Sequence, residues 1–76
     1  MISYQLPQDT VTNLSVFDVA GRLVSILIDG AEQNAGLHSA TWNGCDENGF
    51  RMPSGVYFFR LSAAGTAMTK KMTLVR

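Results

Sequence analysis

Hydrophobic and polar residues alternate along much of this chain with the period of two that is typical of β-strands. The alternation places Ile2, Tyr4 and Leu6 on one strand face, and Leu14 and Val16 on a face of the next predicted strand. No stretch of about 11 residues carries the 3.6-residue periodicity of an amphipathic helix. The chain is therefore predicted to be all-β.

The same alternation predicts inward-facing residues in the second half of the chain. Residues 37–42, 56–62 and 68–75 are the segments concerned, and their inward positions are His38, Ala40, Trp42, Tyr57, Phe59, Leu61, Met72 and Leu74. Residues 23–28 are apolar on both parities. Because Ser25 marks the polar face there, we predict that the core set is Val24, Ile26 and Ile28.

Turn-forming residues separate these segments. Residues 18–22, "DVAGR", are predicted to form a tight hairpin connection in which Gly21 has a positive φ. Residues 29–36 are polar and bounded by glycine, which predicts a loop. Glycine and proline punctuate residues 43–55, so that "FRM" forms at most a short edge strand. Six or seven short strands, with a turn about every ten residues, predict a small Ig-like antiparallel β-sandwich.

One side chain does not fit the alternation, and two aromatic side chains face outward. Lys70 shares its parity with the inward Met72, which requires either a β-bulge or a lysine that extends outward at the end of the sheet. Phe17 and Phe58 fall on outward parities. They could stack on a sugar ring or meet a partner protein, but we favour coverage by neighbouring sequence, since scattered surface aromatics are common.

Composition limits the chain to one small domain of 76 residues. Hydrophobic residues make up 46% of it, and six basic residues balance six acidic ones, which argues against nucleic-acid binding. Cys45 is the single cysteine, so no internal disulfide is expected. The first ten residues lack the features of a signal peptide, and no apolar run approaches the ~20 residues of a membrane helix.

Residues 42–49, "WNGCDENG", resemble a calcium-binding loop at first sight. Calcium requires oxygen ligands at six or more positions, and the EF-hand spacing would place an acidic residue where this chain has Gly55. An Asx turn explains Asp46 and Asn48, with Gly49 in the left-handed conformation. We therefore predict a plain turn and no metal site.

Cys45 and His38 form the one conceivable nucleophile–base pair, and such a pair must lie within about 3 Å. The predicted strand carries the chain about 13 Å away from His38 by Trp42, so the two side chains are not expected to meet. No paired carboxylates stand on facing strands, and no glycine loop precedes a helix. The sequence predicts neither an enzyme nor a cofactor nor a small-molecule substrate.

A set of motifs occurs in a fixed order along the chain. They are "ISYQLP" (2–7), "VFDVAGRLV" (16–24), "GLHSATWNG" (36–44), "DENG" (46–49), "SGVYFFRL" (54–61) and "KKMTLVR" (70–76). With these motifs the chain resembles the C-terminal sorting domain of bacterial type IX secretion (type A), a family related to the FlgD-like Ig-like domains. The chain departs from that family because it lacks the usual Asn-Pro-rich first strand and has Cys45 where a polar or basic residue is usual.

The resemblance implies that residues 1–76 are the C-terminal sorting domain of a larger protein. Its partners would be the outer-membrane export apparatus and the N-terminal cargo domains of the parent chain, and its destination the bacterial cell surface or medium, reached through the periplasm and outer membrane. A structural Ig-like module in a multidomain surface or assembly protein is the alternative, and sugar binding is a more distant one. The recognition residues that the resemblance implies are Gly55, Tyr57, Lys70, Lys71 and Arg76.

Overall fold

Two antiparallel sheets make up the fold. The structure, a computed structural model, describes residues 2–75 and contains six strands and no helix in that range. The strands are β1 (Ile2–Leu6), β2 (Thr10–Phe17), β3 (Leu23–Gln33), β4 (Gly36–Ala40), β5 (Gly55–Ala63) and β6 (Thr66–Leu74). β1 pairs with β4, and the other strands form a four-stranded sheet in the order β3-β2-β5-β6.

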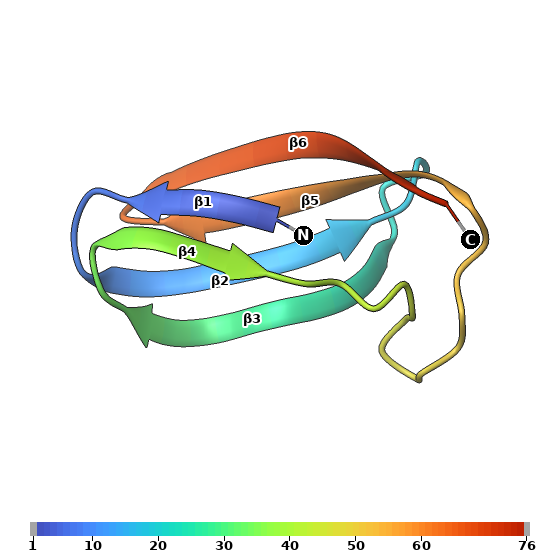
Figure 1. Cartoon of the computed structure of the whole chain (residues 1–76), viewed down its shortest axis with the longest axis horizontal. Coiled ribbons are helices and arrows are strands. Elements are labelled where there is room, and N and C mark those ends of the chain that lie inside the picture. The colour runs from blue at the N-terminus through green and yellow to red at the C-terminus, as the bar shows by residue number, and fades with distance from the viewer. Residues whose placement is uncertain (1, 76) are drawn as a thin grey trace.

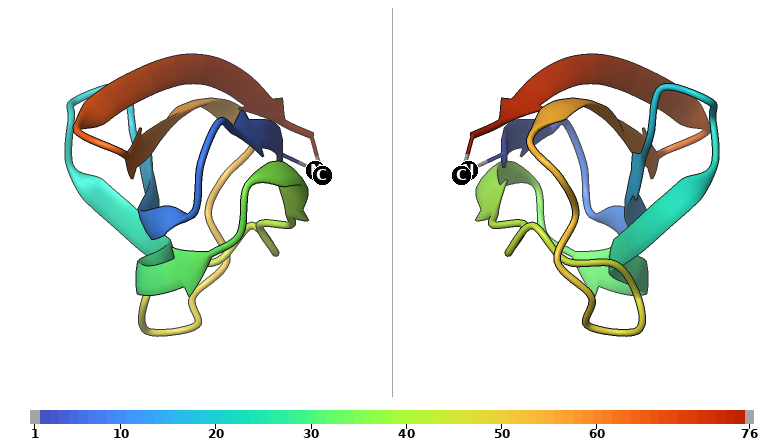
Figure 2. Two further views of the ribbon diagram at one scale, coloured as in Figure 1. Left: turned by 90° about the vertical axis from the view of Figure 1, so that its left-hand side faces the viewer. Right: turned by 90° about the vertical axis from the view of Figure 1, so that its right-hand side faces the viewer.

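The strands lie along the long axis of a body measuring 35 × 21 × 20 Å (Figure 1). Figure 2 shows the four-stranded sheet curving around the core, with β1 and β4 on the open side of the curve. The predicted all-β class and the small antiparallel sandwich are thereby confirmed.

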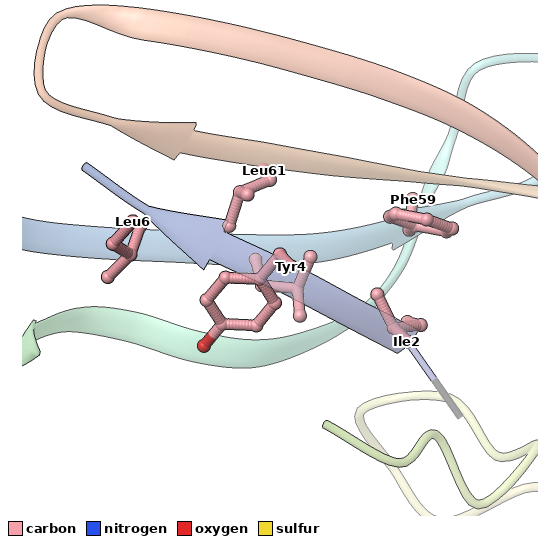
Figure 3. Packing of buried hydrophobic residues seen from close by; sticks show 6 residues of the cluster. Ile2, Tyr4, Leu6, Phe59 and Leu61 are labelled. Atoms are coloured by element: carbon pink, nitrogen blue, oxygen red, sulfur yellow. The ribbon is translucent and has the colours of Figure 1, made fainter. Parts of the chain in front are cut away.

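The core depends on the inward face of β2, the strand between β3 and β5. Thr12, Leu14 and Val16 are each 0% exposed. Alternation alone explains this stripe, because residues i, i+2 and i+4 of a strand lie on one face. Ile2, Tyr4 and Leu6 of β1 pack from the opposite sheet against Leu14, Phe59 and Leu61 (Figure 3). All six residues lie on the inward faces that the alternation predicted.

A second cluster lies toward the other end of the sandwich and consists of Val16, Val24 and Tyr57. Trp42, which follows β4, is half-buried and packs against it. Its ring meets that of Tyr57 edge-on, with 5.0 Å between ring centroids and 63° between planes. Phe59, which shares the inward face of β5 with Tyr57, belongs to the first cluster instead.

The predicted loop at residues 29–36 is wrong. β3 continues through Gln33, and β4 starts at Gly36. The extra residues pair with the start of β2, where Val11 lies opposite Glu32. Gly30 has a φ of 66°, and its N–H donates to Asn13 Oδ1 at 2.8 Å. Pairing with β2 therefore overrides a composition that is typical of loops.

The predicted core set in residues 23–28 is correct for two of its three residues. Val24 is buried, and Ile28 packs against the first cluster, but Ile26 is 40% exposed while Ser25 is buried. The cause is a set of register shifts between β2 and β3, which change the face that successive residues of β3 occupy. Strict alternation cannot anticipate them.

The structure also decides between the two explanations for Lys70. The pairing of β5 with β6 runs without a register shift from Gly55↔Leu74 to Ala63↔Thr66, so there is no bulge at this position. Lys70 lies opposite the buried Phe59 and is exposed because β6 is the edge strand of its sheet. Further along the strand, Met72 and Leu74 pack against the core as predicted.

A matched pair of leucines tests the importance of the β2 stripe. Leu14→Ala should lower the free energy of unfolding by about 2–5 kcal/mol, because it removes a fully buried side chain and leaves a cavity. Leu37→Ala makes the same chemical change at a side chain that is 81% exposed, and should change stability by no more than about 0.5 kcal/mol. Urea unfolding followed by tryptophan fluorescence measures both, and equal effects would place the core elsewhere.

Candidate functional site

Four of the predicted recognition residues lie along one hairpin. Gly55 opens β5 opposite Leu74, and Tyr57 lies opposite Met72. Lys70 and Lys71 on β6 lie opposite Phe59 and Phe58, respectively. The fifth residue, Arg76, lies outside the described residues. The β5–β6 hairpin thus joins motifs that are separated in the sequence.

Of these four residues, only the lysines present their side chains to solvent. Lys70 and Lys71 are exposed, and since they are consecutive they lie on opposite faces of β6. Tyr57 is 4% exposed, so its ring offers a partner little direct contact. A role for Tyr57 and Gly55 in recognition remains a prediction.

The Tyr57 hydroxyl ties the start of β5 to the chain before it. It donates to the Pro53 carbonyl at 2.7 Å, four residues upstream. A tyrosine at the start of a strand that bonds back to upstream backbone is a recurrent corner in Ig-like sandwiches. Together with the Trp42 contact, this bond anchors both ends of the 41–54 segment that connects β4 to β5.

The turn that resembled a calcium loop is an Asx turn, as predicted. Asp46 Oδ1 accepts the N–H groups of Asn48 and Phe50, each at 2.9 Å. Gly49 has a φ of 85°, and its N–H donates to the Asp46 carbonyl at 3.0 Å. The Asp46 carboxylate therefore holds the turn itself. No cluster of three or more metal-ligating side chains occurs among residues 2–75.

The same segment covers the free edge of β3. The Glu47 N–H donates to the Val24 carbonyl at 3.1 Å, and the Ile26 N–H donates to Glu47 Oε1. Trp42 Nε1–H donates to the Cys45 carbonyl at 2.9 Å, which holds the segment folded. Unpaired strand edges invite association with other chains, and these bonds occupy part of that edge.

Cys45 and His38 have separate partners. Cys45 Sγ lies 3.9 Å from the Asn43 carbonyl oxygen. His38 Nε2 lies 2.6 Å from the Asn34 carbonyl oxygen, and its ring stacks on that of Tyr4. Each side chain thus contacts a backbone carbonyl of its own. That the chain is not an enzyme remains a prediction.

Asp18 organises the turn between β2 and β3. Its Oδ1 accepts the N–H groups of Ala20 and Arg22, each at 2.9 Å, and Oδ2 lies 3.0 Å from Arg22 Nε. The bond from the Arg22 N–H is the main cause that lowers the pKa of Asp18 from 3.8, and partial desolvation of the carboxylate opposes it. Gly21 has the predicted positive φ, at 83°.

An apolar strip crosses the outward face of the four-stranded sheet. Leu23, Phe17 and Phe58 lie side by side in register on β3, β2 and β5, and a shallow groove of ≈ 310 Å³ runs beside the two aromatic rings. The outward parity of Phe17 and Phe58 is as predicted. Leu23 was not predicted to lie on this surface. Since residues 18–22 were predicted to connect two paired strands, pairing Phe17 with the residue that follows this connection would have placed Leu23 on the same face.

Comparison with known families identifies a relationship over most of the chain. Residues 2–67 match the model of the FlgD Ig-like domain. The matched range includes Gly55 and Tyr57 and ends before Lys70 and Lys71. No curated protein matches the chain. Among residues 2–75, the structure has no helix long and apolar enough to cross a membrane.

The hydroxyl of Tyr57 provides a test of the corner. Tyr57→Phe should lower the free energy of unfolding by about 0.5–1.5 kcal/mol, because it removes one hydrogen bond and keeps the ring in place. The Trp42–Tyr57 ring contact should survive, so the near-ultraviolet circular dichroism of the folded variant should resemble that of the parent. A variant as stable as the parent would show that the bond does not anchor the segment.

Asp18 predicts a dependence of stability on pH. Because its pKa is lower in the folded state, its charged form stabilises the fold above pH 3.8, and this contribution is lost as the pH falls through the folded-state value. Asp18→Asn should therefore have a lower melting temperature than the parent at about pH 6, and the difference should shrink below about pH 4. Thermal unfolding by circular dichroism measures it. A difference that stays constant down to about pH 2 would contradict the assignment.

Proposed function

The chain belongs to the FlgD Ig-like domain family, and from this premise we propose that it is a non-catalytic structural module of a multidomain surface or assembly protein. Its partners in this proposal are the neighbouring domains of the parent chain. It holds them at a fixed separation through a body whose strands run along the 35 Å axis. Antiparallel sheets in this arrangement resist bending better than a flexible linker does.

The main support for this proposal is that acidic side chains in the loops bind backbone N–H groups. Asp18, Asp46 and Glu47 each accept backbone N–H groups, and in doing so hold a turn or cover a strand edge. Asp9 does the same, since its Oδ1 accepts the Ala35 N–H at 2.8 Å. A carboxylate engaged in this way stabilises the fold and is poorly placed for acid–base chemistry.

Sorting by type IX secretion is the second candidate, and one feature favours it. β6 is an edge strand with two exposed lysines, and an edge strand can add to the sheet of a receptor. Lysines on an edge strand also prevent unwanted pairing between sheets. A structural module needs this protection as well. The lysines therefore fit both functions.

An export assay separates the two functions. Residues 1–76 would be fused behind a periplasm-targeted fluorescent protein in a bacterium that has type IX secretion. For a structural module, the fusion should stay folded in the periplasm. Delivery to the cell surface that is lost in the Lys70→Ala/Lys71→Ala variant, and kept in the control Arg51→Ala, would overturn the structural proposal in favour of sorting. All three basic residues are exposed, so these substitutions should change stability little.

A domain replacement provides the positive test. Residues 2–75 in the parent protein would be replaced by an unrelated β-sandwich of similar length. A structural module should tolerate the exchange, so the abundance and protease resistance of the neighbouring domains should remain within about twofold of the original. Replacement by a flexible Gly/Ser linker of equal length is the matched control and should reduce both. Equal results for sandwich and linker would contradict the proposal.

A further inference from the structure

The outward face of the four-stranded sheet combines apolar and charged residues in a distinctive order. The apolar strip of Leu23, Phe17 and Phe58 has Ile26 on one flank and Val56 on the other, and both flanking residues face outward. Leu23 is 51% exposed and Ile26 is 40% exposed. Scattered apolar residues are ordinary on a surface, but a contiguous group across three strands marks an interaction site.

Charge is distributed unequally across this face. The β5–β6 side carries Arg60 and Lys71, both exposed and facing outward. No acidic residue occupies an outward position of β2, β5 or β6 as the structure describes these strands. On the opposite side, Glu47 lies at the β3 edge beside Ile26 and is exposed. The face is thus basic at the β6 edge and apolar in the middle, and Glu47 is acidic at the β3 edge, where the neighbouring Arg22 is paired with Asp18.

From this distribution we infer that the outward sheet face binds a second copy of this chain, through a two-fold axis parallel to the strands. Such a rotation places the β3 edge of one copy over the β6 edge of the other, so that the acidic side meets the basic side twice. A two-fold axis perpendicular to the strands would place like edges together and repel. The charges therefore favour the parallel axis over the perpendicular one.

The register of the aromatic residues fits the same axis. Phe17 and Phe58 are directly paired on the two central strands, β2 and β5. A two-fold axis that runs between these strands brings Phe17 of one copy onto Phe58 of the other, at the same level along the strand. The centre of the interface is then two aromatic pairs surrounded by aliphatic side chains, and aromatic residues at the centre of an interface contribute most of its binding energy.

At the rim, Glu47 of one copy approaches Lys71 of the other. Lys71 lies in the same row of paired residues as Leu23, because Phe58 and Phe17 connect them across the sheet. Ile26 is the next outward residue of β3 after Leu23, and Glu47 lies beside it. The Glu47 carboxylate already accepts the Ile26 N–H through Oε1, which holds it at the sheet edge. These charges orient the two copies and make the association depend on ionic strength.

The face is small, so the association is expected to be weak. Four strands at ~4.8 Å spacing make a face roughly 19 Å wide, and over the 35 Å long axis its flat area is at most about 670 Å², below the about 800 Å² per partner of a standard interface. The dissociation constant should lie between about 1 µM and 1 mM. Within a larger assembly, several such contacts would act together.

Sedimentation equilibrium of the 76-residue chain, from about 10 µM to 1 mM, tests the inference. The apparent mass should rise toward that of a dimer, and added salt should reduce it. Phe58→Thr should weaken the dimer by at least tenfold, because it removes an aromatic ring from the centre. Leu37→Thr removes a more exposed side chain from the other sheet and should have no effect. Circular dichroism confirms that both variants fold.

The two neighbouring lysines provide the sharper control. Lys71→Glu places a negative charge opposite Glu47 and should weaken the dimer severalfold, whereas Lys70→Glu makes the same change on the other face of β6 and should leave it intact. Glu47→Gln keeps the acceptor for the Ile26 N–H and removes only the charge, so it should weaken the dimer and reduce its salt dependence. A chain that remains monomeric at 1 mM, or equal effects of the two lysine substitutions, would overturn the inference.

Discussion

The structure depends on one buried stripe, the inward face of β2. Thr12, Leu14 and Val16 have no exposed surface, and β2 pairs with both β3 and β5. A chain of this length buries only about 60% of its unfolded surface, and this one has no disulfide to compensate. Coverage of Leu14 by β1 and of Val16 by Trp42 is therefore a condition for the fold, because the two-stranded β1–β4 sheet is marginal alone and the four-stranded sheet alone would expose its apolar face.

The edges of the sheets explain the remaining features. The four-stranded sheet has edges at β3 and β6. The 41–54 segment covers part of the β3 edge, and for that purpose it uses Trp42 and Glu47, the residues that first suggested a chemical site. The β6 edge is protected by charge instead, through Lys70 and Lys71. What resembled a calcium loop and a basic signal thus contribute, at the least, to keeping a small sheet from pairing with other sheets.

The two faces of β6 distinguish receptor binding from self-association. Lys70 lies on the side of the core and Lys71 on the outward side. Receptor binding by strand addition would use the edge and both lysines, whereas self-association uses the outward face and Lys71 alone. Membership in the FlgD Ig-like domain family accounts for the sandwich, but function depends on such surfaces, which differ among proteins that share a fold.

The sequence by itself determined the fold class and most of the core. Alternation identified the inward faces of β1, β2 and β5, and turn chemistry identified the glycine turns at Gly21 and Gly49, because side-chain parity and positive φ are local properties of the chain. Of the candidate site, it identified the exposed lysines and the outward Phe17 and Phe58.

Only the tertiary structure decided the extension of β3 to Gln33, the outward position of Ile26 and the absence of a bulge at Lys70. It also decided that Glu47 caps the β3 edge and that Leu23 joins the apolar strip. Each of these depends on which strand lies beside which and in what register. Register is set by contacts between distant segments, and a single shift moves the following side chains to the opposite face.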